Sequence, residues 1–440
     1  MGCQTATIKH VLCAQSQSQR CYPLAPYVTF PKDGWSSGKG GLLLDTHILP
    51  DKLQRCSDDR SWFWWSDAQF LPFNDACLFT TTSVYQPRLY RHWLPVSSIP
   101  SGRVLMYDLL SSGQMQCSIF SRTSCSVFPN VNPHPLGKMV AYCGTGEVVV
   151  MSTSGDPVYS RSRDICNAVH VHCAIANNGV SFACLKRGMG TFFLESYSLD
   201  SIMFCDDSIR CHTVCPGFVP SNNEPNIVVC KFSPDSTLLA GSSNKGYLFV
   251  VKRYQLQKLS VVCPDMTSRQ LSTAQAFDFC PCSPFQIITL GTSDRQILTV
   301  NIDTGQVVVS TETEQNIDCV TFTPDGLFLA VGFHNFDIDI YDSFSLVCVH
   351  NIQMSALCQD QLPRVQALAP TVLHLSFTQN GEHLASTSCD GHLRLWRIRR
   401  MFSLQEICRD KILTCIAIHR IEELTNVPQK VKHFLQYKYF

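Results

Sequence analysis

Cysteine and histidine side chains are the groups in this sequence that could bind a metal or act as nucleophile and base. Two local cysteine clusters, Cys205 with Cys211 and Cys215, and Cys280 with Cys282, have the composition of metal-ligand sets. Neither contains a Cys-x-x-Cys pair matched by a second pair, which is the spacing typical of structural zinc sites. The sequence therefore predicts no metal site and no bound cofactor. A metal-dependent enzyme that uses these clusters is one alternative.

Known catalytic motifs are missing from the sequence. It contains no G-x-S-x-G elbow, H-E-x-x-H helix, G-x-x-x-x-G-K-[ST] loop or dinucleotide fingerprint between a strand and a helix. His170 and His172 alternate along an expected strand, so they lie on one sheet face, where packing or surface roles are more common than ligation. We therefore expect a protein that binds partners and is not an enzyme.

Charge and hydropathy exclude several classes of partner. Lysine and arginine, 35 together, balance 35 aspartates and glutamates, so no net field attracts nucleic acid or an anionic membrane. The N-terminus has no secretory signal pattern, and no apolar run reaches the about 18 residues of a membrane span. The 24 cysteines are spread through apolar segments, as reduced core thiols would be. These features predict a cytoplasmic protein, with the nucleus as the alternative, and no general nucleic-acid binding.

A unit of about 40 to 50 residues recurs along the chain. Its clearest copy, residues 226–251, has three β-rich runs joined by the turns Ser233-Pro234-Asp235-Ser236 and Asn244-Lys245-Gly246. Six further copies follow the same order of strands and turns: residues 62–82 with 102–109, 127–156, 167–200, 276–305, 316–342 and 371–398. The chain thus contains seven copies of one three-stranded unit.

The copy at residues 371–398 resembles the WD repeat. Its segment "SCDGHLRLW" is close to the second turn and third strand of that family, with Asp390 in the turn and Trp396 on the strand. In the family, the aspartate and a Ser or Thr of the second strand hydrogen-bond toward the tryptophan and a histidine. Here Thr387 or Ser386 would take the hydroxyl role. The glycine-histidine pair expected upstream is missing, so the repeats are degenerate.

One such repeat cannot bury both of its faces, so the copies must stack on one another. The resemblance implies an all-β fold, a seven-bladed WD-type β-propeller over residues 61–398. In the family an N-terminal strand closes the last blade, and residues 41–49 or residues 7–14 could supply it. We favour residues 41–49, which lie nearer the first blade. They belong to an N-terminal segment, residues 1–60.

The connection between the second and third strands of the first copy is unusually long. Residues 83–101 fill it, whereas about two to five residues would suffice. In the family this connection lies on the face that commonly holds ligands, and Tyr, Trp and Arg are enriched at binding hot spots. The predicted substrate-binding residues are Tyr85, Arg88, Tyr90, Arg91, His92 and Trp93. Their charge favours an acidic or phosphorylated segment of a partner. The alternative is packing of Tyr90 and Trp93 on the propeller.

Helical spacing replaces strand alternation after the last repeat. Leu404, Cys408 and Ile412 recur at every fourth position beside Ile407, forming one apolar stripe, and Ser403 is the expected N-cap. The pattern resembles the elongin-binding box of a SOCS box: a small or polar residue, Leu, three residues, Cys, three residues and an aliphatic residue. The resemblance implies that Leu404, Ile407, Cys408 and Ile412 bind elongin C, which carries elongin B.

The end of the chain resembles the second half of a SOCS box, in which a proline-containing turn opens a helix. Val431, Phe434 and Leu435 would share one face of a helix that begins near Pro428. The resemblance implies a contact of Val427, Pro428, Val431, Phe434 and Leu435 with Cullin-5 and its RING protein, with Cullin-2 as the alternative. The cullin-selecting stretch departs from the Leu-Pro-aliphatic-Pro pattern, because only its last two residues match.

The two resemblances together imply a member of the WD-repeat and SOCS-box-containing family. A small C-terminal α-helical SOCS box would then occupy residues 399–440. Such a protein is the substrate-recognition subunit of an elongin B/C-cullin-RING ubiquitin ligase, in which the propeller binds the target. The alternative is a WD-repeat scaffold without ligase function, whose C-terminal helices pack on the propeller.

Overall fold

Antiparallel β-sheets dominate the described part of the chain in the computed structural model. It describes residues 27–31, 35, 41–48, 63–85, 103–122, 130–144, 147–155, 157–161, 169–188, 191–198, 229–242, 248–252, 259–261, 274–282, 287–292, 294–354, 371–398, 428 and 431–432. The chain divides into two compact units, Pro26–Ile398 and Met1–Ala25 with Arg399–Phe440. All strands named below belong to the first unit.

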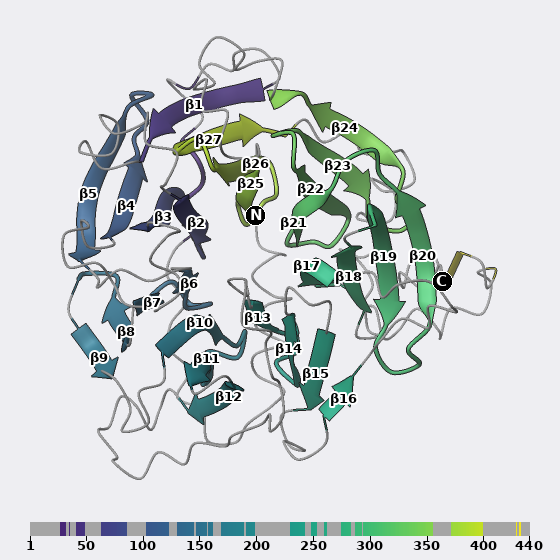
Figure 1. Cartoon of the computed structure of the whole chain (residues 1–440). Helices are drawn as coiled ribbons and strands as arrows, with labels where there is room; N and C mark the ends of the chain where they lie inside the picture. The colour runs from purple at the N-terminus through teal and green to yellow at the C-terminus, as the bar shows by residue number, and fades with distance from the viewer. Residues whose placement is uncertain are drawn as a thin grey trace. The chain divides into compact units, whose positions relative to one another are not determined.

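Six sheets are built from strands that follow one another in sequence (Figure 1). The first sheet contains β2 (Phe63–Leu71), β3 (Asn74–Tyr85), β4 (Arg103–Leu109) and β5 (Met115–Arg122). The second contains β6 (Val131–Pro133), β7 (Met139–Gly144), β8 (Glu147–Ser152) and β9 (Pro157–Arg161). The third contains β10 (Val169–Ile175), β11 (Ser181–Gly188) and β12 (Thr191–Ser198). The fourth sheet contains β13 (Val229–Phe232), β14 (Leu238–Ser242), β15 (Leu248–Lys252) and β16 (Leu259–Val261). The fifth contains β17 (Ala274–Phe279), β18 (Ile287–Thr292), β19 (Gln296–Asn301) and β20 (Val307–Glu312). The sixth contains β21 (Ile317–Phe322), β22 (Phe328–Phe333), β23 (Ile338–Asp342) and β24 (Cys348–Ile352).

The last sheet joins the two ends of the propeller sequence. It contains β25 (Val372–Phe377), β26 (His383–Ser388), β27 (His392–Arg397) and β1 (Leu42–His47), which pairs antiparallel with β27. The closing strand therefore comes from residues 41–49, the segment that the sequence favoured. Gly41 precedes it with a φ of +84°, and a Cβ there would lie 2.5 Å from the carbonyl oxygen of Arg397. Only glycine fits that approach.

The seven sheets form a closed ring within their unit. The first strand of each sheet contacts the first strand of the next, and β25 contacts β2, which returns the ring to its start. Figure 1 shows these seven inner strands, β2, β6, β10, β13, β17, β21 and β25, nearest the middle of the ring. The fold is therefore an all-β, propeller-like arrangement of mainly four-stranded sheets.

The core lies between neighbouring sheets. Leu78 and Leu105 of the first sheet pack with Leu393 and Leu395 of the last, and equivalent apolar clusters join the sheets of β13 to β20 and of β17 to β24. No sheet could bury its faces without both neighbours, which is why seven marginal units form one cooperative body.

A short side-chain motif forms the first turn of three sheets. Thr323 donates a hydrogen bond to Asp325 Oδ1 (2.6 Å) and accepts one from the Phe328 N–H (3.1 Å). Ser233 with Asp235, and Thr378 with Asn380, make the same contacts. Such side chains hydrogen-bond to groups within the same turn, so the ends of the flanking strands follow directly from the local sequence.

A segment before β1 ties the first sheet to the last. The Val28 N–H donates to the Phe73 carbonyl (2.8 Å), and the Asp75 N–H donates to the Val28 carbonyl (2.9 Å). The Phe30 ring stacks on His383 of β26 with centroids 3.9 Å apart.

Among the described residues, no helix is long and apolar enough to cross a membrane.

Candidate functional site

The inner strands carry polar residues that face the ring in pairs. Successive side chains of a strand point to opposite faces, so residues two apart share a face. Asp67 and Gln69 on β2 are such a pair, and His374 and Ser376 on β25 are another. An inner strand is also the edge of its sheet, so its outward N–H groups need partners from outside the ladder.

Side chains of each inner strand bond to the next inner strand, and we call this set the inner ring. Five side chains accept a backbone N–H: Asp67 from Val131 (2.9 Å), Asn130 from Cys173 (3.2 Å), His172 from Cys230 (3.4 Å), Asp278 from Phe322 (2.9 Å) and Ser376 from Phe70 (3.3 Å). Lys231 pairs with Asp278 at 3.1 Å, and the Cys319 thiol donates to the Val372 carbonyl at 3.5 Å. All seven junctions are thus bridged.

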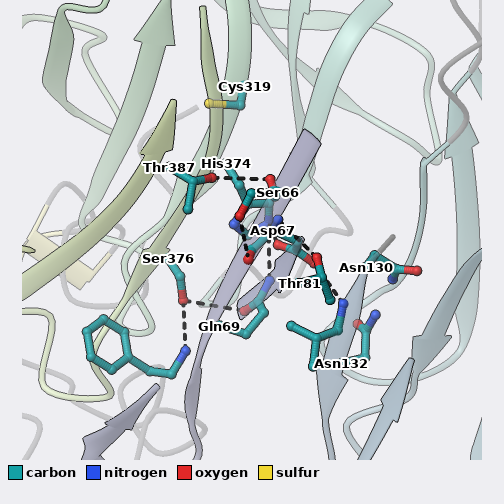
Figure 2. A network of polar contacts seen from close by, with 12 residues as sticks. Ser66, Asp67, Gln69, Thr81, Asn130, Asn132, Cys319, His374, Ser376 and Thr387 are labelled. Atoms are coloured by element: carbon teal, nitrogen blue, oxygen red, sulfur yellow. Dashed lines mark hydrogen bonds and ion pairs between the residues drawn. The ribbon is translucent and has the colours of Figure 1, made fainter. Parts of the chain in front are cut away.

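Asp67 occupies the junction between the first and last sheets (Figure 2). Its Oδ1 lies 2.9 Å from Nε2 of His374. Burial raises the pKa of the Asp67 carboxyl, but the electrostatic attraction and hydrogen bond of His374, with the Val131 N–H, outweigh it and lower the pKa below its usual range. The carboxylate form is therefore the stable one in the folded chain.

Further hydroxyl and amide groups connect the same two sheets. The Thr387 hydroxyl donates to the Ser66 carbonyl (3.2 Å), and the Ser376 hydroxyl donates to Gln69 Oε1 (3.4 Å). Figure 2 shows these contacts converging on β2 from β25 and β26. This junction, where the ring closes, is therefore a polar interface as well as an apolar one.

The inner ring contains a cysteine and a histidine in contact, but not an activated nucleophile. His172 Nδ1 lies 3.4 Å from Cys230 Sγ. Burial lowers the pKa of His172 to about 4 and raises that of the Cys230 thiol well above its ordinary value. A buried, protonated thiol is a poor nucleophile, so these groups stabilise the ring. In the described part of the chain, no three His, Cys, Asp or Glu side chains are grouped as metal ligands.

The WD-type contact of the last sheet differs in detail from the expectation. Trp396 Nε1 donates to Ser386 Oγ (2.8 Å), so Ser386 and not Thr387 is the tryptophan partner. Asp390 accepts from Ser388 (2.6 Å) and from Arg394 Nη2 (2.6 Å) rather than from a histidine side chain. A buried arginine has replaced the family's histidine as the partner of the turn aspartate.

The predicted substrate-binding segment is described only at its start. Tyr85 is the last residue of β3 and is paired with Phe63, so the long connection begins after it and ends at β4. Residues 83–85 thus extend the strand instead of belonging to the connection, because the long β2 continues the ladder to Phe63. Arg88, Tyr90, Arg91, His92 and Trp93 lie outside the described residues.

The C-terminal prediction is also described in part. The N–H groups of Val431 and Lys432 donate to the Pro428 carbonyl at 2.9 and 3.0 Å, and residues 431–432 are helical. Val431 is 41% exposed. The other predicted elongin and cullin contacts lie outside the described residues: Leu404, Ile407, Cys408, Ile412, Val427, Phe434 and Leu435.

Sequence reasoning did not identify the inner ring. The sequence pattern that marks the inner ring is two polar residues separated by one residue within the otherwise apolar first strand of a repeat. Asp67 with Gln69, and His374 with Ser376, are examples. In a sheet that faces water on one side, the same alternation marks the solvent face. An inner-ring strand can be told apart from a solvent-facing strand only when it is known that this edge of the sheet faces other sheets.

Comparison with known proteins supports the fold. Residues 277–362 match the family model of the anaphase-promoting complex subunit 4 WD40 domain, and residues 365–397 match the WD domain, G-beta repeat. No curated protein matches the sequence.

Two solved structures have a similar fold at low identity. A chain in a crystal structure of the mitotic checkpoint complex has a TM-score of 0.55 and 14% identity, covering 88% of this chain and 100% of that one. Chaetomium thermophilum Sqt1, solved bound to the N-terminus of ribosomal protein L10, has a TM-score of 0.52 and 14% identity, covering 77% and 97%. Together with the repeats and the closed ring of sheets, these matches show that the chain has a WD40-type β-propeller fold.

Proposed function

We propose that this WD40-repeat protein is the substrate-recognition subunit of an elongin B/C-cullin-RING ubiquitin ligase. The observation that carries the proposal is the pattern Ser403-Leu404-x-x-x-Cys408-x-x-x-Ile412, which follows shortly after β27. Leu404 and Cys408 insert into elongin C, where a small, weakly polar thiol enters a pocket that would reject a larger side chain. Ile407 and Ile412 extend the same apolar stripe.

The helix that starts at Pro428 would contact the cullin. Its exposed Val431 supports this role, because an apolar side chain at a helix start is available to a partner. Cullin-5 with its RING protein is the proposed partner, and Cullin-2 is the alternative. The complex would act in the cytoplasm, with the nucleus as the alternative.

The propeller would hold the target, and no residue of this chain would transfer ubiquitin. The mechanism is proximity: a bound target lysine is kept at high local concentration near a charged conjugating enzyme. A ring of sheets that is bonded at every junction suits this role, because a rigid body holds its target at a constant distance. The basic and aromatic connection after Tyr85 is the proposed contact for an acidic or phosphorylated segment.

Co-purification with elongins B and C tests the ligase function. The wild-type chain should retain both, whereas a Leu404→Ala, Cys408→Phe variant should lose both. An Arg409→Ala, Asp410→Ala variant is the matched control, since it changes the opposite face of the same expected helix and should retain them. A wild-type chain that captures no elongins would leave only the scaffold function.

A second experiment separates target binding from ligase assembly. Replacing Arg88, Arg91 and Trp93 with alanine should abolish target capture while elongins remain bound. If the captured targets stay the same, the target surface lies elsewhere on the propeller. Proteasome inhibition during capture keeps short-lived targets measurable.

A further inference from the structure

Two cysteines that the inner ring does not use lie in contact on one turn. Cys280 and Cys282 flank Pro281 between β17 and β18, and their Sγ atoms are 3.7 Å apart. Cys280 is 6% exposed, whereas Cys282 is only partly buried. Cys282 is therefore the more exposed residue of the pair.

The neighbouring sheet leaves room for the outer thiol. Gly326, in the turn between β21 and β22, has a φ of +69°, and a Cβ there would lie 2.5 Å from Cys282 Sγ. The backbone at Gly326 thus borders the sulfur without any side chain in between. Both cysteines also pack against one apolar cluster, which includes Ile287 and Leu346.

The geometry allows the two sulfurs to form a bond. Cα atoms two residues apart are separated by at most about 7 Å, and less in a turn, which is within the range of a disulfide. The sulfurs must approach from 3.7 Å to about 2.0 Å, a change that rotation of the less buried Cys282 side chain can supply.

We propose that Cys280 and Cys282 form a redox-active dithiol that hydrogen peroxide or an organic hydroperoxide converts into a disulfide within the turn. The Cys282 sulfur attacks the peroxide, an S–O bond forms as the O–O bond breaks, and water or an alcohol leaves. The Cys280 sulfur then attacks the Cys282 sulfur, an S–S bond replaces the S–O bond, and a second water leaves with the thiol proton. Two thiols lose two electrons, which reduce the hydroperoxide.

Other described cysteines are less suited to this reaction. Burial raises the pKa of the Cys77 and Cys389 thiols to about 12, which leaves almost no thiolate at neutral pH. Cys348 is exposed, but its thiol donates a hydrogen bond to the His350 carbonyl (3.5 Å) rather than to a second thiol. Cys348 is therefore a control for general oxidation of exposed thiols. The competing explanation is that Cys280 and Cys282 are core thiols that merely touch.

Peptide mass spectrometry of the full-length chain distinguishes these explanations. Trypsin cleaves after Arg269 and Arg295, and the peptide 270–295 contains Cys280 and Cys282 as its only cysteines. The chain is treated with increasing hydrogen peroxide, unfolded in guanidinium chloride, alkylated with N-ethylmaleimide and digested. We expect this peptide to lose two hydrogens and resist alkylation at peroxide concentrations that leave Cys77 and Cys389 alkylated. Dithiothreitol before alkylation should reverse the change.

Two outcomes would overturn the proposal. One is a doubly alkylated peptide 270–295 at peroxide concentrations that already oxidise Cys348, and the other is a disulfide from Cys282 to a different peptide. A Cys282→Ser variant should show no loss of two hydrogens, and Cys348→Ser should behave like wild type. If the Cys282→Ser variant fails to fold, the test is instead made by adding a trivalent aryl arsenical to the wild-type chain. Bridging of both thiols by one arsenic supports the pair, and failure to bridge contradicts it.

Discussion

Nε2 of His374 on β25 lies 2.9 Å from Oδ1 of Asp67 on β2, so a side-chain pair joins the last sheet of the ring to the first. The same sheets are joined by β1, which pairs with β27 on the outer side of the last sheet. Contacts at both edges of the last sheet therefore contribute to ring closure.

Replacing Asp67 with asparagine should destabilise the chain in a pH-dependent way. Asparagine can still accept the Val131 N–H, but it loses the ionic hydrogen bond to His374, which should cost about 1.5 to 3 kcal/mol at pH 7. Because folding lowers the pKa of Asp67, its stabilising contribution is present above pH about 4 and is lost as the pH falls below that value. Urea unfolding at pH 7 and at pH 3 measures both effects. If the two proteins differ in free energy of unfolding by the same amount at both pH values, the role of Asp67 as a stabilising carboxylate is contradicted. Asp303→Asn, on an exposed turn, is the neutral control.

Replacing Arg394 with methionine should weaken the attachment of β1. Arg394 is 1% exposed, and its guanidinium lies 2.6 Å from Asp390 and 3.3 Å from Asp45 of β1. Methionine keeps most of the side-chain volume but leaves the buried Asp390 carboxylate without its cation and Asp45 with only His392, which should cost about 3 to 5 kcal/mol. The melting temperature should fall by several degrees, whereas Arg295→Met, on an exposed turn, should leave it unchanged. Equal melting temperatures for the two variants would show that Arg394 is not needed for closure.

His383 should make the chain sensitive to acid. Its ring is 5% exposed, and neither ring nitrogen has a hydrogen-bond partner among the described residues. Burial lowers its pKa to about 4, so the unfolded chain binds the proton more tightly and stability falls as the pH decreases from about 6.5 to 4. His383→Phe keeps a ring to stack on Phe30 and should be more stable than wild type by about 2 kcal/mol at pH 5, with little difference at pH 8.

A second histidine serves as the control for that measurement. His134 Nε2 bonds to the Gly179 carbonyl (3.0 Å), and its Nδ1 accepts the Leu136 N–H (3.1 Å). His134→Phe removes both hydrogen bonds, so it should be destabilising at pH 8 as well as at pH 5. A His383→Phe variant that loses stability equally at both pH values would mean that its nitrogens are hydrogen-bonded in solution.

Removal of β1 should prevent closure of the ring. The fragment 26–398 comprises one compact unit and should melt cooperatively. The fragment 49–398 lacks β1 and the Phe30 contact, which exposes the edge of β27 beside the buried residues Leu393 and Trp396. It should aggregate or melt at a much lower temperature. Limited proteolysis with circular dichroism compares the two, and equal stability would show that β1 is dispensable.

Local patterns predicted a large part of this fold. Strand alternation and the turn Ser233-Pro234-Asp235-Ser236 placed strands that the structure confirms, because the contacts of such a turn form between residues two to five apart. The seventh repeat was recognised from Asp390 and Trp396, although the hydroxyl partner remained ambiguous between two adjacent residues. Adjacent strand residues face opposite sides of a sheet, so only the pairing of β26 with its neighbours selects Ser386 for Trp396 and leaves Thr387 for Ser66.

The amino-acid pattern alone predicted the repeat number, the first turns and the long connection after β3, since each arises from neighbours in sequence. The partners of Asp67 and Arg394 emerged only from the folded ring. His374 is about three hundred positions from Asp67, and Asp45 is similarly distant from Arg394, so no local propensity links them. Such pairs form because the curvature of seven stacked sheets brings the first and last together, a property of the whole ring that no single repeat contains.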